Sequence, residues 1–336
     1  MKKKPVMIDV DTGIDDAMAL VIACAAENLD IKGVTTVAGN VEVKDTTRNT
    51  LNVLDLLGRG DIPVAAGAAA PLARPLAKAS YVHGATGLRG YNFKENVRYA
   101  LREEPAWDFM RQVLESSGEK VTLCALGPVT NLAVLIEKYP EVKPKIERIV
   151  FMGASYHTGN PGPVQTFNVM VDPEAFRQVV HSGVPFYAVP LDTTRKAYLT
   201  AQEKEAVKEM AGPAAELVQG VLFSYGAAFV TGDEQLDDGQ EVSTTTGNKE
   251  REGGKTCLHD PSTVAFLTAP ELFTVAGPYY CDVECKGELT SGFTLIDKED
   301  WYCKDEDEKH FYFVDSVNRE GLKDLFYRSI RHYQKG

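Results

Sequence analysis

The stretch VMIDVDTGIDDAMAL, residues 6–20, decides the fold, because it joins an apolar run to a helical pattern through a cluster of acids. Asp9, Asp11, Asp15 and Asp16 lie close together there. Like charges this close cost free energy unless a cation lies among them or some of them stay protonated. An acid in the first turn of a helix explains Asp15 or Asp16. It does not explain Asp9 and Asp11, for which the alternative is a cage of oxygen ligands around a hard divalent cation.

Further along the chain, apolar runs alternate with helical patterns. The runs are VMID (6–9), KGVTTVAG (32–39), VTLCALG (121–127), RIVFMGA (148–154) and PFYAVPLD (185–192). After the second of these runs, residues 41–60 predict a helix in which Leu51, Leu54 and Leu57 share one face. This alternation predicts an α/β fold with a mainly parallel central sheet and helices on both faces. Ligands of such sheets bind beyond the carboxyl ends of the strands. Asp9, Asp11, Asn40 and Asn160 each follow an apolar run, so we expect them to gather there.

Composition limits the class of protein. The chain has 336 residues, of which 44% are hydrophobic and 25% charged, and a formal net charge of -12. A nucleic-acid partner is not expected, because phosphate binding needs a basic surface. The apolar part of the N-terminal segment is too short for a secretory signal and no apolar run spans a membrane, so we expect a cytoplasmic protein. We predict a single domain over residues 1–336, with a surface loop or lid at 232–255.

One alternative comes from a short resemblance. DVDTG (9–13) is similar to the motif of haloacid-dehalogenase-type phosphatases, which form an aspartyl phosphate with Mg²⁺, and GDEQLDD (232–238) is similar to their later GDxxxD motif. That family has Thr or Val where this chain has Gly13, and it gives no reason for the pair Asp15–Asp16. Its GDxxxD also follows a buried strand, whereas here it opens a polar stretch.

A second resemblance covers nearly the whole chain. DVDTGIDDAMAL (9–20) resembles the opening motif of the inosine-uridine-type nucleoside hydrolases. The further matching segments, in order, are TTVAGN (35–40), VHGATGL (82–88), LGPVTNLA (126–133), FMGASYHTGN (151–160), FNVMVDPEA (167–175), LHDP (258–261) and KGELT (286–290). The resemblance implies a Rossmann-like fold and an enzyme that hydrolyses the N-glycosidic bond of ribonucleosides to free nucleobase and ribose, in nucleoside catabolism or salvage.

The resemblance also implies a Ca²⁺ ion at the bottom of the pocket. The ion's ligands would be Asp11, Asp16, Asp260 and the main-chain carbonyl of Leu126, with Asp9 supporting them from behind. Asp11 would in addition take a proton from a metal-bound water. The chemistry suits this arrangement, because positive charge develops on the sugar as the N-glycosidic bond breaks.

The same comparison assigns the substrate contacts. Ribose hydroxyls would bind Asp15, Asn40 and Asn168, the 5′ end of the sugar would lie near Asn160, and the base would face His259 and His83, either of which would protonate it as it leaves. Tyr225 is a candidate to close over the base, although an aromatic side chain at helical spacing is more typical of a core. Homodimers or homotetramers are expected from the family.

One departure from the family concerns substrate choice. The usual pattern has a glutamate that binds the 5′-hydroxyl, and this chain has Thr166 in that place, in VQTFN (164–168). Threonine is shorter and uncharged, so the 5′ end would be held differently. This leaves three readings open: an ordinary nucleoside hydrolase, a specialist for a modified nucleoside such as a 7-deazapurine, and a non-catalytic nucleoside-binding relative. The sequence does not separate purine from pyrimidine preference.

Overall fold

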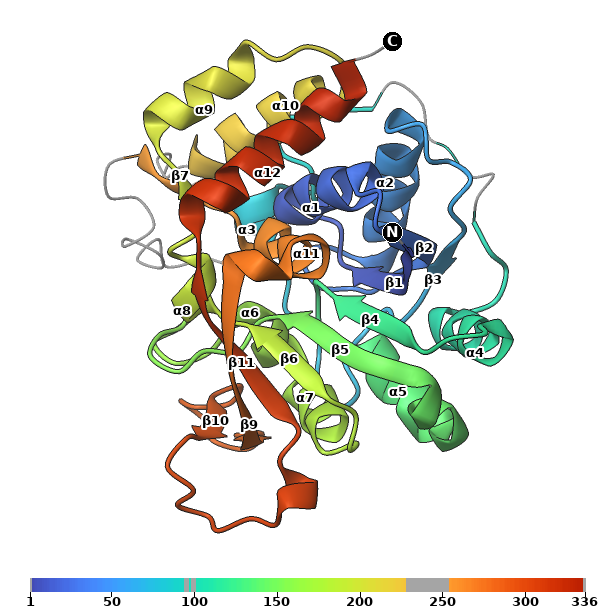
Figure 1. Ribbon diagram of the computed structural model, residues 1–336, viewed down its shortest axis with the longest axis vertical. Coiled ribbons are helices and arrows are strands. Elements are labelled where there is room, and N and C mark those ends of the chain that lie inside the picture. Colours follow the sequence, from blue (N-terminus) through green and yellow to red (C-terminus); the bar gives the residue numbers. More distant parts are fainter. Residues whose placement is uncertain (1, 94–96, 98–100, 228–253, 335–336) are drawn as a thin grey trace.

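The computed structural model describes residues 2–93, 97, 101–227 and 254–334, and Figure 1 shows their arrangement. The strands are β1 (Lys4–Val10), β2 (Leu29–Thr36), β3 (Val64–Ala66), β4 (Val121–Ala125), β5 (Ile146–Met152), β6 (Phe186–Val189), β7 (Tyr198–Leu199), β8 (Thr256–Cys257), β9 (Phe273–Val283), β10 (Thr294–Asp297) and β11 (Phe311–Val317). The helices are α1 (Ile14–Ala25), α2 (Val43–Leu56), α3 (Ser80–His83), α4 (Ala106–Ser116), α5 (Thr130–Lys138), α6 (Phe167–Val171), α7 (Pro173–Val180), α8 (Leu191–Thr194), α9 (Ala201–Lys208), α10 (Pro213–Ala227), α11 (His259–Thr268) and α12 (Arg319–Arg331).

The central sheet has nine strands in the order β10-β9-β11-β6-β5-β4-β1-β2-β3. Every neighbouring pair from β3 across to β11 is parallel, and β9 runs antiparallel to both β11 and β10. The chain builds outward from β1 to β3, then crosses to β4 on the other side of β1. The strand order therefore reverses between β1 and β4, which is where doubly wound sheets bind ligands.

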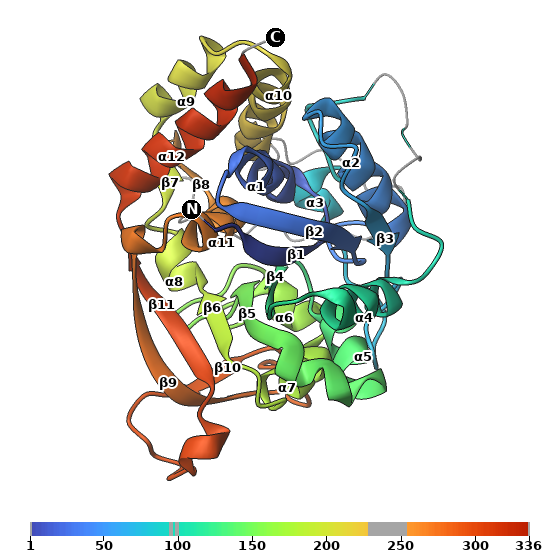
Figure 2. The same ribbon diagram turned by 45° about the vertical axis from the view of Figure 1, so that its right-hand side comes forward.

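Helices cover both faces of this sheet, as the two views in Figures 1 and 2 show. One apolar core joins alternate residues of β1, such as Val6 and Ile8, to α1, α2, α10, α11 and α12. The other core begins at Met7 and joins the opposite face to α4, α5 and α7. Successive side chains of a strand point to opposite faces, so one short apolar strand contributes to both cores.

Helix α2 forms where the leucine spacing predicts it. Leu51, Leu54 and Leu57 are all buried, and they pack in the core with α1. Gly58 follows the helix with a φ of 68°. This left-handed conformation is strained for other residues, so glycine suits the end of the helix.

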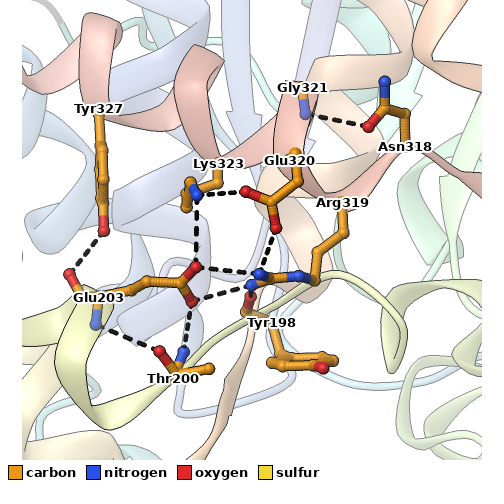
Figure 3. A network of polar contacts seen from close by, with 9 residues as sticks. All are labelled: Tyr198, Thr200, Glu203, Asn318, Arg319, Glu320, Gly321, Lys323 and Tyr327. Atoms are coloured by element: carbon orange, nitrogen blue, oxygen red, sulfur yellow. Dashed lines mark hydrogen bonds and ion pairs between the residues drawn. The ribbon is translucent and has the colours of Figure 1, made fainter.

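A polar network joins α9 to the last helix, α12 (Figure 3). The Glu203 carboxylate receives hydrogen bonds from Arg319 at 2.8 and 3.0 Å and from Lys323 at 3.3 Å. Glu203 also accepts a bond from the Thr200 N–H at the start of α9. One half-buried carboxylate thus holds the C-terminal helix against α9.

The predicted strands and fold class are confirmed, since each of the five apolar runs contributes a strand of one mainly parallel sheet. The antiparallel addition of β9 and β10 is not in the prediction. All six cysteines lie in the described part of the chain, and none of them forms a disulfide bond. Among the described helices, none is long and apolar enough to cross a membrane. Most of the predicted lid at 232–255 falls outside the described residues, which resume at 254.

Candidate active site

A pocket lies at the carboxyl ends of the parallel strands, next to the reversal of strand order. Its wall comes from segments far apart in the sequence: Asp11, Asp15, Asn40, Ala79, Tyr81, Val82, His83, Leu126, Met152, Gly153, Asn160, Thr166, Phe167, Asn168, Leu191, Tyr225, His259 and Asp260. Most of the residues predicted for the site are in this wall. Asp16 and Asp9 are not, and both are buried behind it.

Three carboxylates meet at the bottom of the pocket. One oxygen each of Asp15, Asp16 and Asp260 lies within 4.8 Å of the others, and all three residues are buried. Asp15 and Asp16 come from the first turn of α1, and Asp260 from the first turn of α11. The sequence-based prediction placed Asp15 on the ribose, whereas here its carboxylate belongs to the same cluster as two predicted metal ligands.

Burial disfavours the charged forms of Asp11, Asp16 and Asp260. It raises the pKa of Asp16 to about 7, and the neighbouring Asp15 charge adds to the effect. The pKa values of Asp11 and Asp260 are also raised, first by burial and then by the charges of the neighbouring aspartates. His83 Nδ1 lies 4.0 Å from Asp15 Oδ1, but burial lowers the pKa of this histidine, so it brings little positive charge. A cation would supply the missing positive charge.

Asp11 is held in a cradle that only glycine backbone permits. A Cβ on Gly39 would lie 2.2 Å from Asp11 Oδ2, and one on Gly127 would lie 2.6 Å from Oδ1. The Asn40 N–H donates to Asp11 Oδ2 over 2.8 Å. The loops after β2 and β4 therefore close around this carboxylate, which fixes its orientation toward the pocket.

Asp16 also has the structural role that the simpler reading gave it. Its carboxylate accepts hydrogen bonds from the N–H groups of Gly13 at 2.9 Å and Asp11 at 3.3 Å, and so caps α1. Asp15 Oδ1, by contrast, is buried and has no hydrogen-bond partner. A buried carboxylate oxygen without a partner is costly, so this atom points to a missing ligand.

Two amide side chains flank the acids. Asn40 Nδ2 donates to Asp16 Oδ2 at 3.2 Å, and Asn168 Nδ2 donates to the Leu126 carbonyl at 2.5 Å. A carbonyl oxygen has two lone pairs, so Leu126 can accept this bond and still offer an electron pair to the pocket. Both amides line the pocket, and their contact with the ribose hydroxyls stays a prediction.

The two predicted histidines lie in the pocket wall and are oriented by protein contacts. Nδ1 of His83 accepts a hydrogen bond from the Ile14 N–H over 3.0 Å, and Nδ1 of His259 lies 2.7 Å from the Thr194 hydroxyl. Burial lowers the pKa of His83. A neutral imidazole that accepts at Nδ1 carries its proton on Nε2. His83 is therefore a hydrogen-bond donor through Nε2.

Thr166 and Asn160 each accept a hydrogen bond from a main-chain N–H group. Asn160 Oδ1 accepts from the Phe167 N–H at 2.9 Å, and the Thr166 hydroxyl oxygen accepts from the Ala154 N–H at 3.2 Å. Both residues line the pocket. Thr166 is only 2% exposed, so a larger residue there has to take space from the pocket.

Asp9 is buried near the carboxyl end of β1. One carboxylate oxygen accepts from Thr35 at 2.6 Å and from Asn131 at 2.8 Å, while the other is buried without a partner. Burial raises the pKa of Asp9 to about 7, and the two hydrogen bonds offset part of that rise. Asp9 ties β1 to β2 and α5, and its side chain does not line the pocket.

Sequence reasoning missed Tyr81, an aromatic residue in the wall. Tyr81 lies in the short helix α3, two residues before His83, and lines the pocket. Tyr225, for which the sequence left both a place over the base and a core position open, also lines the pocket, with its ring centroid 6.2 Å from that of His83. Aromatic rings stack on planar bases. The available signal was that Tyr81 directly precedes the matching segment VHGATGL (82–88).

The pocket thus combines three kinds of group. Buried acids provide hard oxygen ligands and stabilise developing positive charge, amides provide bonds for hydroxyl groups, and imidazole and aromatic rings suit a planar heterocycle. This combination fits a polar sugar attached to a flat base.

Comparison with known proteins gives a consistent result. The model of the family described as "Inosine-uridine preferring nucleoside hydrolase" matches residues 6–324. The pyrimidine-specific ribonucleoside hydrolase RihA of Citrobacter koseri is 38% identical over 331 residues, which cover 98% of each chain. RihA of Escherichia coli O7:K1 is 37% identical over 331 residues, or 98% of this chain and 99% of that one.

Solved structures agree on the fold. A plant nucleoside hydrolase, the PpNRh1 enzyme, has a TM-score of 0.83 and 27% sequence identity over 98% of this chain and 99% of that chain. A purine-preferring ribonucleoside hydrolase from Gardnerella vaginalis has a TM-score of 0.86 and 25% identity over 99% of each chain.

Proposed function

Because the chain belongs to the inosine-uridine preferring nucleoside hydrolase family, we propose that it hydrolyses the N-glycosidic bond of pyrimidine ribonucleosides to free base and ribose. The observation that carries the reaction is the buried acid cluster beside Asn40, Asn168 and the two histidines in one pocket. The curated relatives named above are called pyrimidine-specific, and this supports the base preference. Membership of this family argues against the phosphatase alternative.

The proposed metal is Ca²⁺, held by Asp11, Asp16, Asp260 and the Leu126 carbonyl. Two observations support the fit: the buried Oδ1 of Asp15 has no hydrogen-bond partner, and burial beside other aspartates raises the pKa values of Asp16 and Asp260. All donors are oxygens, as Ca²⁺ prefers. A bound Ca²⁺ supplies positive charge that neutralises the acids and orients the sugar hydroxyls. Asp15 then joins the cluster as a neighbour or a further ligand.

The remaining roles belong to the side chains. Asp11, fixed by Asn40 and the glycine cradle, takes a proton from the attacking water. The carboxylates stabilise the positive charge that develops on the sugar, and Asn40, Asn168 and Asp15 hold its hydroxyls.

At the base, His83 donates a hydrogen bond through Nε2, and His259 delivers the proton to the departing ring. Asn160 and Thr166 face the 5′ end. Asp9 keeps the acid cluster in place from below.

A reducing-sugar assay tests the proposal and separates the alternatives. The substrates are uridine, cytidine, inosine, adenosine, guanosine and a 7-deazapurine nucleoside. We expect the highest kcat/KM on a pyrimidine. Turnover of the 7-deazapurine alone identifies the specialist, and tight binding without turnover identifies the non-catalytic relative. Asp16→Ala, examined by elemental analysis, should lose calcium that the wild-type protein retains.

The homodimer or homotetramer and the cytoplasmic location stay predictions of the sequence. Multi-angle light scattering tests the first, and cell fractionation tests the second.

A further inference from the structure

The short helix α8 and the following Arg195 hold the loop of residues 154–159 along its whole length. This loop connects Gly153 to Asn160, and both of these residues line the pocket. The Asp192 carboxylate accepts from the Ser155 hydroxyl at 3.0 Å, from the Tyr156 N–H at 2.8 Å and from the His157 N–H at 3.0 Å.

The two ends of the same loop are bonded to residues on either side of Asp192. Leu191 N–H donates to the Ala154 carbonyl at 3.2 Å. The Arg195 guanidinium donates to the Thr158 hydroxyl at 2.7 Å and to the Gly159 carbonyl at 2.8 Å. Each residue from 154 to 159 is therefore bonded to Leu191, Asp192 or Arg195.

Helix α8 also contacts the start of α11, where His259 lines the pocket. The Thr194 hydroxyl lies 2.7 Å from Nδ1 of His259, and both residues are buried. Just beyond α8, the Ala197 carbonyl accepts from the Leu258 N–H at 2.8 Å. One turn of helix is thus bonded to the histidine on one side and to the Asn160 loop on the other.

The helix itself is fixed to the sheet. The Thr193 hydroxyl donates to the Val314 carbonyl of β11 at 2.6 Å, and Leu191 is fully buried. The loop has a further contact of its own, because the Lys298 ammonium lies 3.9 Å from the centre of the Tyr156 ring. A rigid support of this kind keeps two groups at a set spacing.

We propose that Asp192 and Thr194 are positioning residues, through which α8 sets the Asn160 loop and the His259 ring relative to one another around the bound nucleoside. The inference rests on the proposed function and adds to it: neither residue touches the substrate, and each acts on one end of it. Substitutions at the two positions should therefore lower activity to different extents on different substrates.

Asp192→Asn tests the loop. The carboxylate accepts three hydrogen bonds, whereas the NH₂ group of an asparagine side chain can only donate. At least one of the three bonds is therefore lost. We expect kcat/KM on uridine to fall about tenfold. On 5′-deoxyuridine, which lacks the group that Asn160 faces, the fall should be no more than about twofold.

Thr194→Val tests the histidine, because it keeps the shape of the side chain and removes the hydroxyl. We expect an about tenfold fall in kcat on uridine and on 5′-deoxyuridine alike. On 4-nitrophenyl β-ribofuranoside the fall should be small, because nitrophenolate leaves without help from a donor. Thr194→Ser, which keeps a hydroxyl, should restore most of the activity.

Thr193→Val is the matched control, since its hydroxyl bonds to β11 rather than to the pocket wall. It should lower the melting temperature and leave the ratios between the three substrates unchanged. Equal losses on uridine and 5′-deoxyuridine for Asp192→Asn, or on uridine and the nitrophenyl riboside for Thr194→Val, would overturn the inference alone. A wild-type protein that cleaves none of the three would overturn the proposed function and the inference together.

Discussion

The main-chain N–H of Ile14, at the start of α1, donates a hydrogen bond to Nδ1 of His83 over 3.0 Å. A Cβ on Gly13 would lie 2.4 Å from the same nitrogen, so the glycine of the acid-rich turn makes room for the ring. The turn that brings the acids together therefore also fixes the histidine. A main-chain N–H always donates, so Nδ1 is an acceptor and the ring proton is on Nε2.

His83→Asn and His83→Ala separate these two roles. Asparagine can accept from the Ile14 N–H through Oδ1 but does not reach the base, whereas alanine leaves that buried N–H unpaired. Both variants should lose about tenfold or more in kcat/KM. Only alanine should also lose about 1–3 kcal/mol of unfolding free energy, measured by urea denaturation. Equal stability of the two variants would contradict the role of the Ile14 bond.

Gly39→Ala tests the cradle around Asp11. The added Cβ would lie 2.2 Å from Asp11 Oδ2, so the carboxylate has to turn away. We expect kcat to fall by about two decades or more, because a misplaced reacting group is costly. Gly118→Ala is the control, since its Cβ would meet no atom within 4 Å, and it should keep full activity. A fully active Gly39→Ala would contradict the assignment of Asp11 as the base.

The sequence predicts the parallel part of the sheet and most of the pocket, for a physical reason. Strands such as β4 and β5 are buried on both faces, so their sequences are continuous apolar runs. The polar residues of the site follow these runs directly in the sequence. Strand β9 is different, because much of its length is exposed or half-buried and its sequence carries neither a continuous apolar run nor a clear alternation. The place of Asp15 within the acid cluster depends on how α1 packs against α11, which local patterns do not contain.

Thr166→Glu tests recognition of the 5′ end. A glutamate that reaches the 5′-hydroxyl makes a charge-assisted hydrogen bond, worth about 1.5–3 kcal/mol. If uridine is an ordinary substrate, kcat/KM should rise by about one to two decades, and 5′-deoxyuridine should gain little. A variant that binds calcium and loses activity on every nucleoside would contradict this, and would mean that Thr166 already makes a dedicated contact.

The Glu203–Arg319 pair predicts a stability change in acid. Arg319 lowers the pKa of Glu203 to about 2, against about 4.3 for an unfolded glutamate. Between these values the unfolded chain binds more protons, so the pair's contribution is complete above about pH 4.3 and is lost as the pH falls toward 2.

Glu203→Gln should therefore be less stable than the wild-type protein at pH 7, and the difference in unfolding free energy should shrink as the pH falls below about 4.3. The control is Glu115→Gln, which removes an exposed pair with Arg111 and should have little effect at any pH. A Glu203→Gln difference that does not change with pH would contradict the ion-pair account.

The most direct measurement is product analysis of uridine treated with the purified protein in phosphate-free buffer, using chromatography for uracil and a reducing-sugar assay for ribose. The account predicts uracil and ribose in equal amounts, loss of both after chelation, recovery on adding Ca²⁺, and no turnover by Asp11→Ala. Undiminished release by Asp11→Ala or by the chelated protein would contradict the proposed site. Hydrolysis of phosphate esters, with uridine and the other nucleosides left intact, would contradict the account as a whole.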